Sequence, residues 1–127
     1  MSKKQIATSS APAAIGPYSQ AVQVDSLLFI SGQLPLVPET GKLLEGSIEE
    51  KTRQVMKNIN AILDEAGGKL EDIVKTTIFL TDLADFQKVN AAYGSYFKEI
   101  PPARATIQVA ALPLGAPVEI EAVAVIK

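Results

Sequence analysis

The pattern of apolar and polar positions predicts a long helix in the middle of the chain. Between residues 47 and 68, apolar or small side chains recur at steps of three and four, as on the buried face of a helix. These positions are Ile48, Thr52, Val55, Ile59, Ile62 and Ala66. Ser47, with Glu50 three positions later, is typical of a capping box, and the Gly67–Gly68 pair is typical of a helix end. A helix beginning after Ser47 and ending before Gly67 is therefore predicted.

A second helix is predicted after Thr81 or Asp82. Apolar and aromatic residues again follow a helical spacing there, at Phe86, Val89, Tyr93 and Tyr96. Pro101 and Pro102 are expected to end this helix, since proline cannot continue it.

The remaining apolar segments have the content of strands. Extended structure is predicted for four segments, namely residues 21–31, 73–80, 103–109 and 118–126. Asp25 and Ser26 are turn-forming residues, so the first segment reads as a hairpin. Residues 35–46 contain two prolines and two glycines and are expected to form a surface loop.

The last predicted strand is apolar on both faces toward its end. Alternation places one set of side chains on one face, namely Val118, Ile120, Ala122 and Ala124. The other face carries Glu119, Glu121, Val123 and Val125. Two helices can cover one face of a sheet, which leaves the other face for a second copy of the chain. A homo-oligomer is therefore predicted, although a sheet curled over its own loops would also cover this face.

Composition limits the class of protein. The chain has 127 residues, of which 47% are hydrophobic and 20% charged, so we expect one globular domain over residues 1–127. Its net charge is −2 and its lysines are dispersed, which predicts neither a nucleic-acid nor a membrane partner. The segment MSKKQIATSSAPAA does not read as a secretory signal, and no apolar run approaches the roughly 20 residues of a membrane span. A cytoplasmic location is expected.

The absence of two residue types narrows the chemistry. The chain contains no histidine and no cysteine. Catalytic triads that use histidine, thiolate nucleophiles and cysteine or histidine metal sites are therefore excluded, and no metal or cofactor is expected. Carboxylates, tyrosine, lysine, arginine, hydroxyls and backbone groups remain as candidates.

Arg104 is the one charged residue between Glu99 and Glu119, in a segment otherwise suited to burial. If the strands 103–109 and 118–126 pair as antiparallel neighbours, Arg104 approaches Glu119 or Glu121. One interpretation is then a buried structural ion pair. The other is that the guanidinium grips a small carboxylate ligand through two parallel hydrogen bonds, with a glutamate as the nearby general base.

Two further segments carry candidate groups. In IGPYSQA, residues 15–21, a rigid turn precedes Tyr18, whose hydroxyl is either a site group or merely satisfied within the core. In ISGQLP, residues 30–35, a strand runs into Ser31 and Gly32. Glycine there permits close approach of a ligand, but a bulge or strand end explains it equally well.

Taken together, these segments resemble one known family. The stretches IGPYSQAV, ISGQLP, DIVKTTIFL, DFQKVNAAY, PPARAT and VEIEAVAV occur in this order from about Ala11 to the C-terminus. The combination resembles the Rid family, the reactive intermediate deaminases, which is also called the RidA or YjgF family.

The resemblance implies a fold and an assembly. The expected fold is α+β and chorismate-mutase-like, a mixed sheet with two helices on one face. The expected assembly is a homotrimer with the sheets inward and clefts between subunits. In those clefts Arg104 is expected to bind the substrate carboxylate and Glu119 to position a water. Other cleft positions of the family correspond here to Tyr18, Ser31, Gly32, Phe86, Asn90 and Thr106.

The resemblance also implies an activity, hydrolysis of 2-aminoacrylate and its imine 2-iminopropanoate to the 2-keto acid and ammonia. The corresponding enzyme is a 2-iminobutanoate/2-iminopropanoate deaminase. Many bacterial relatives have cysteine where Thr106 stands, so hydrolysis here must proceed without a thiol. The alternative is a non-catalytic regulatory trimer that binds small carboxylates. RNA cleavage, attributed to some relatives, is disfavoured by the lack of histidine and of a basic stripe.

Overall fold

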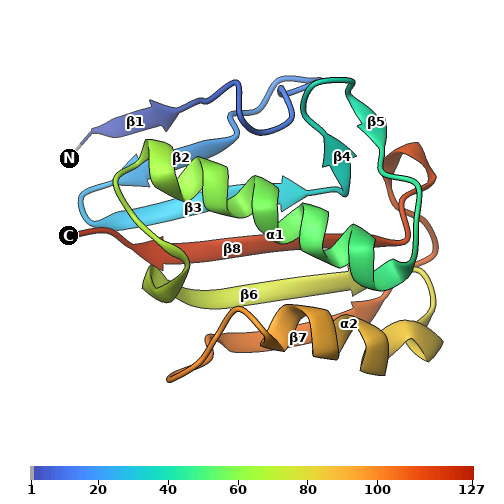
Figure 1. The fold of residues 1–127 in the computed structure, drawn as a ribbon. Helices are drawn as coiled ribbons and strands as arrows, with labels where there is room; N and C mark the ends of the chain where they lie inside the picture. Colours follow the sequence, from blue (N-terminus) through green and yellow to red (C-terminus); the bar gives the residue numbers. More distant parts are fainter. Residues whose placement is uncertain (1) are drawn as a thin grey trace.

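A computed structural model describes residues 2–127 and shows a mixed α+β fold. Six strands form one sheet in the order β1-β2-β3-β8-β6-β7. The strands are β1 (Lys3–Ile6), β2 (Ala21–Val24), β3 (Leu27–Gln33), β6 (Ile73–Leu80), β7 (Ala103–Gln108) and β8 (Val118–Val125). Neighbouring strands are antiparallel except β6 and β7, which run parallel. Figure 1 shows α1 and α2 on the same side of this sheet, which confirms the expected layers.

The predicted central helix is α1 (Ile48–Glu65). The Ser47 side chain accepts from the Glu50 amide, and the Glu50 carboxylate accepts from the Ser47 amide, so the capping box is present. These hydrogen bonds from Ser47 lower the pKa of Glu50. At the other end Gly67 has a φ of 81°, a conformation that glycine adopts without strain.

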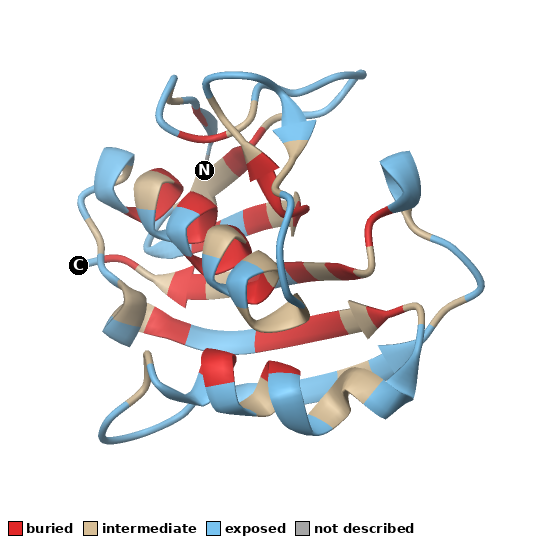
Figure 2. Ribbon diagram, turned by 45° about the vertical axis from the view of Figure 1, so that its right-hand side comes forward, coloured by how far each residue is buried: buried red, intermediate tan, exposed pale blue. Residues whose placement is uncertain are grey.

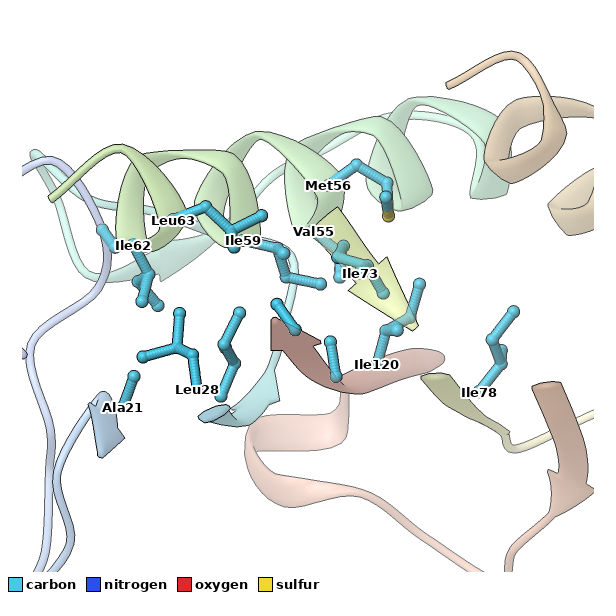
Figure 3. Close-up of a cluster of buried hydrophobic side chains, with 14 of the residues drawn as sticks. Ala21, Leu28, Val55, Met56, Ile59, Ile62, Leu63, Ile73, Ile78 and Ile120 are labelled. Atoms are coloured by element: carbon cyan, nitrogen blue, oxygen red, sulfur yellow. The ribbon is translucent and has the colours of Figure 1, made fainter. Parts of the chain in front are cut away.

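The core lies between α1 and the sheet. Figure 3 shows Val55, Ile59 and Ile62 of α1 directed toward Leu28 and Ile120 of the sheet. All five side chains are fully buried. This burial of one helix face and one sheet face is the main hydrophobic contribution to the fold. Figure 2 shows the same separation, with buried residues on facing surfaces and exposed residues on the outer side of the helices.

The predicted strands and hairpin are confirmed, with the turn at Asp25, whose φ is 54°. The segment 35–46 is more regular than expected, because β4 (Leu36–Val37) and β5 (Lys42–Leu43) form a two-stranded sheet. Asn58 of α1 fixes this segment by donating to the carbonyl oxygens of Leu34 and Leu36, at 3.1 and 2.9 Å. β1 is an edge strand that the sequence pattern did not predict.

The second helix is shorter than predicted. A 3₁₀ turn, η2 (Leu83–Asp85), leads into α2 (Phe86–Gly94), which ends well before Pro101. Tyr96 therefore lies outside the helix, although it still packs against the core. Two other short 3₁₀ turns, η1 (Leu70–Asp72) and η3 (Pro113–Gly115), precede β6 and β8.

Among the described residues, no helix combines the length and the apolar character needed to cross a bilayer.

Candidate functional site

Arg104 lies on β7, the strand at one edge of the sheet, and its side chain is exposed. It pairs in register with Thr76 of β6 and faces the layer that contains α2. The guanidinium Nη1 donates to Oδ1 of Asn90 at 2.7 Å. The Arg104 Cζ also lies 5.6 Å from the ring centroid of Phe86 and 5.4 Å from that of Tyr93. Both distances are within the range of a cation–π interaction.

The sequence spacing explains why α2 can support the guanidinium. Phe86 and Asn90 are four residues apart, so they lie on the same helix face one turn from each other. Both are half-buried, between the helix and the edge of the sheet. Asn90 uses its carbonyl oxygen on Nη1, which leaves the other guanidinium donors for a ligand.

Thr106 lies two residues beyond Arg104 and therefore on the same face of β7. Its Oγ1 is buried and has no hydrogen-bond partner within residues 2–127. An unpaired buried hydroxyl is costly, so this atom is suited to receive a ligand or a water. We call Phe86, Asn90, Arg104 and Thr106 the arginine half-site.

Glu119 lies on the opposite face of the sheet. Its neighbours Val118 and Ile120 are fully buried beneath the helices, so alternation along β8 directs the Glu119 side chain away from them. β6 separates β8 from β7 in the sheet, with Glu119 in register with Phe79. The antiparallel pairing of the strands that carry Arg104 and Glu119, on which their approach within one chain depended, is therefore not formed. An ion pair of Arg104 with Glu119 or Glu121 inside one chain is excluded, since both glutamates share the open face.

Gly32 closely adjoins the Glu119 carboxyl group. A Cβ atom at Gly32 would lie 2.9 Å from Cδ of Glu119 and would meet Oε2 more closely still. The register between β3 and β8 shifts between Ile30 and Gln33, so Gly32 lies in a bulge of β3. A glycine at this bulge leaves the space that the carboxylate occupies.

Ser31 and Tyr18 flank the same bulge. The Ser31 hydroxyl donates to the Ser19 carbonyl at 2.6 Å, and the Ser31 amide donates to the Gln20 carbonyl at 2.9 Å. These bonds hold the loop that carries Tyr18, whose side chain is half-exposed. Tyr18 and Gly32 both line a small hollow of about 30 Å³. We call Tyr18, Ser31, Gly32 and Glu119 the glutamate half-site.

The environment of Glu119 changes its acidity. Burial raises the pKa of the Glu119 carboxyl above its ordinary value of 4.5, and the charge of Glu121 on the same face raises it further. A raised pKa makes the carboxylate a better proton acceptor. Both causes act in the same direction, and Arg104 of the same chain lies on the opposite face of the sheet.

Three supporting residues were not predicted from the sequence as site residues. Gln20 is buried, and its carboxamide bonds to backbone atoms of Thr8, Ala11 and Pro12, which braces the loop before Tyr18. Tyr93 and Thr76 form a buried hydrogen bond beneath Arg104. For Tyr93 the available signal was a hydroxyl in a largely apolar helix stripe, a signal that Tyr96 shares.

Other hollows lie away from these residues. One of about 480 Å³ lies beside α1 and is lined in part by Arg53, Lys57, Leu70 and Tyr96. On the open sheet face, Phe29, Thr77 and Glu121 line another of about 190 Å³. Over residues 2–127, no cluster of acidic side chains has the arrangement of a metal site. The free guanidinium donors of Arg104 suit a carboxylate ligand, and the raised pKa of Glu119 suits a proton acceptor.

Comparison with known proteins identifies related sequences over almost the whole chain. Residues 8–126 match the model of a protein family described as Endoribonuclease L-PSP. The chain is 54% identical over 123 residues to the 2-iminobutanoate/2-iminopropanoate deaminase of Mus musculus, covering 97% of this chain and 91% of that protein.

Solved structures show the same fold. The crystal structure of YyfA from Yersinia pestis, described as a member of the conserved Rid protein family, has a TM-score of 0.96 and 52% identity. The superposition covers 98% of this chain and 100% of that one. E. coli TdcF, solved with bound serine, has a TM-score of 0.93 and 42% identity, covering 98% of this chain and 99% of that one.

Proposed function

The chain belongs to the Rid family, the reactive intermediate deaminases, and we propose that it hydrolyses enamine and imine intermediates to 2-keto acids and ammonia. The proposed substrates are 2-aminoacrylate and small 2-imino acids such as 2-iminopropanoate and 2-iminobutanoate. The observation that carries the proposal is the supported but ligand-accessible guanidinium of Arg104. A planar fork of donors suits a planar carboxylate next to a C=N bond.

We further propose that the working site lies between two copies of the chain, in a homotrimer with its sheets inward. Arg104 and Glu119 lie on opposite faces of one sheet, so a single chain cannot direct both at one small substrate. The open face of the sheet also carries half-exposed apolar side chains, including Leu27, Phe29 and Ile107. Packing these faces together would bury the apolar side chains, and we propose that Arg104, on the edge strand β7, meets the glutamate half-site of the neighbouring subunit at the rim of this interface.

The chemistry follows from these groups. Arg104 binds the carboxylate of the imino acid, and Thr106 offers a hydroxyl beside it. Glu119 accepts a proton from a water as the water oxygen bonds to the imine carbon, while the C=N electron pair moves to nitrogen, which takes up a proton. Glu119 then returns its proton to the nitrogen, and the C–N bond breaks as the hydroxyl proton of the adduct passes to solvent, which balances the proton that the nitrogen took up and leaves ammonia and the 2-keto acid. An imine carbon is already electrophilic, so positioning supplies much of the acceleration.

The first test replaces Arg104 by alanine and by lysine. Imines are generated in situ from several amino acids, and release of 2-keto acid is followed with and without the protein. Arg104→Ala should abolish the acceleration while the circular dichroism spectrum stays that of the folded protein. Arg104→Lys should retain little of the acceleration, because an ammonium group lacks the planar fork of donors that a guanidinium has. Wild-type turnover by a folded Arg104→Ala protein would contradict the proposed role.

The second test mixes two inactive variants, Arg104→Ala and Glu119→Gln, under conditions in which subunits exchange. If each cleft takes Arg104 from one subunit and Glu119 from the next, about a quarter of the clefts in an equal mixture have both native groups. About a quarter of the wild-type rate should therefore return. No recovery after demonstrated exchange would contradict a shared site.

The alternative function is a non-catalytic regulatory trimer that binds small carboxylates. The bound serine of E. coli TdcF, a relative with the same fold, is the observation that favours it. Glu119→Gln distinguishes the two functions, because an enzyme should lose rate while it retains ligand. A wild-type protein that binds pyruvate saturably but accelerates no imine hydrolysis would be such a regulator.

A further inference from the structure

The side of Arg104 that faces α2 is supported by more than Asn90. The Arg104 Cζ lies 5.4 Å from the centroid of the Tyr93 ring, slightly nearer than the 5.6 Å to Phe86. Unlike Phe86, which is half-buried, Tyr93 is only 4% exposed. Arg104 therefore rests on a ring that belongs to the core.

The Tyr93 ring is fixed by its hydroxyl. Its oxygen lies 2.7 Å from Oγ1 of Thr76, in a buried hydrogen bond that joins α2 to β6. Thr76 is 1% exposed, so neither hydroxyl has ready access to solvent as a substitute partner. The cost of leaving either group unpaired holds the ring in one orientation. The ring also contacts Phe97, with centroids 4.9 Å apart.

Strand register connects this hydrogen bond to the site. Thr76 is the residue on β6 that pairs with Arg104 on β7. The same pair of strand positions thus carries the guanidinium and the hydroxyl that fixes the ring beneath it. A phenylalanine at position 93 would fill the core equally well, so packing alone does not account for a hydroxyl at this position.

We propose that Thr76 and Tyr93 are positioning residues for Arg104, in which the buried hydroxyl pair holds the aromatic ring that orients the guanidinium toward a carboxylate ligand. The ligand class rests on the function proposed above, whereas the orientation of Arg104 does not depend on turnover. Neither residue touches the substrate; both act through Arg104.

The orientation can be measured directly in the ligand-free protein. The chain contains two arginines, Arg53 and Arg104. Its arginine Nε–Hε region in a ¹⁵N–¹H spectrum therefore has two signals. The Arg104 signal should be displaced by the ring currents of Phe86 and Tyr93, while exposed Arg53 serves as an internal reference.

Three variants separate positioning from packing. Thr76→Val keeps the shape but leaves the Tyr93 hydroxyl unpaired, so the ring should turn and the Arg104 signal should move toward that of Arg53. Tyr93→Phe removes the hydroxyl but keeps the ring. The double variant Thr76→Val/Tyr93→Phe removes the hydrogen bond without leaving a polar atom unpaired, so stability should recover, whereas nothing fixes the ring and the Arg104 signal should stay shifted toward that of Arg53. Thr52→Val, at an equally buried threonine of α1, is the control for loss of stability and should leave the Arg104 signal in place.

The functional readout is the affinity for pyruvate, the keto-acid product, together with KM and kcat for imine hydrolysis. Thr76→Val should weaken pyruvate binding and raise KM by about five-fold, the equivalent of ~1 kcal/mol, with kcat nearly unchanged. The double variant should show a similar loss of pyruvate affinity, although its Tm recovers. Thr52→Val should lower Tm without changing KM.

The outcomes are distinguishable. An Arg104 signal and pyruvate affinity that are unchanged in a folded Thr76→Val protein would overturn the positioning role. Recovery of either readout by the double variant would also overturn it, because apolar packing without the hydroxyl pair would then suffice to orient Arg104. If the wild-type protein hydrolyses no imine, the proposed function fails, yet the spectrum still tests the orientation of Arg104.

Discussion

Gly32 shows how one missing side chain shapes the site. The atoms that an added Cβ would meet belong to the end of the flexible Glu119 side chain rather than to backbone. The backbone of Gly32 has no positive φ that would make another residue strained. A substitution should therefore displace the carboxylate without unfolding the protein.

We predict that Gly32→Ala lowers kcat/KM by about ten-fold or more, while the free energy of unfolding changes by less than about 1 kcal/mol. Steady-state kinetics and urea denaturation of the same samples measure the two effects. Gly94→Ala, at the end of α2, is the matched control, since an added Cβ there meets nothing within 4 Å. It should keep full activity, and a Gly32→Ala protein that does the same would show that Glu119 needs no fixed position.

The acidity of Glu119 leads to a prediction about pH. Its pKa is raised by burial and then by Glu121, so the ionised base forms at a pH above the ordinary carboxyl value of 4.5. On the acidic side of the pH profile, kcat/KM should therefore fall at a pH above 4.5, which kinetics between about pH 4 and pH 8 would measure. Glu121→Gln removes one of the two causes and should move this fall to lower pH. A fall that stays at the same pH would assign it to another group.

The same shift affects stability in a defined direction. A carboxyl with a raised pKa binds its proton more tightly in the folded state than in the unfolded state. The contribution of Glu119 is thus fully present below pH 4.5 and is lost as pH rises through its higher folded pKa.

The residue pattern identified the important charge but not its surroundings, whereas the family resemblance named Phe86, Asn90 and Thr106, which the structure places beside Arg104. Arg104 stood out in the sequence because it is a lone charge in an apolar segment, and the structure gives it partners on α2 rather than on β8. Whether a charge is met by a carboxylate or by aromatic rings depends on strand order. Strand order is set by contacts far apart in the sequence.

At the scale of elements, the sequence predicted α1, the hairpin and the strands well because their periodicity and caps are local. The order β8-β6-β7 was not predictable in this way, because β6 and β7 are joined through α2 as a parallel pair. This crossover separates the strands of Arg104 and Glu119. The pattern for α2 extended too far because Tyr96 and Phe97 pack on the core without being helical.

Asn58 is the clearest stabilising polar contact between elements. It is fully buried, donates to the Leu34 and Leu36 carbonyls, and accepts from Nε2 of Gln54 at 2.9 Å. Asn58→Ala leaves these backbone acceptors without a donor and should reduce the free energy of unfolding by roughly 2–4 kcal/mol. Urea denaturation measures this, with the exposed Asn60→Ala on the same helix as control, expected within about 0.5 kcal/mol of wild type. Equal effects at both positions would contradict the special role of Asn58.

At the scale of the whole molecule, the open sheet face should determine assembly. Phe29 is 46% exposed at the centre of this face, beside β8. Phe29→Glu would place an unpaired charge in the proposed interface and should shift the protein from trimer to monomer. Sedimentation velocity at several concentrations measures the state, with Asn60→Glu on the outer face of α1 as control. A wild-type protein that is monomeric throughout would contradict the shared site.

Placing the two reactive groups on opposite faces of one sheet has a consequence for mixed populations. Each chain would contribute to two clefts, with Arg104 in one of them and Glu119 in the other. A chain altered in both half-sites but still able to assemble would therefore inactivate both of the clefts to which it contributes. Such a double variant, expressed beside the native protein, should behave as a dominant inhibitor.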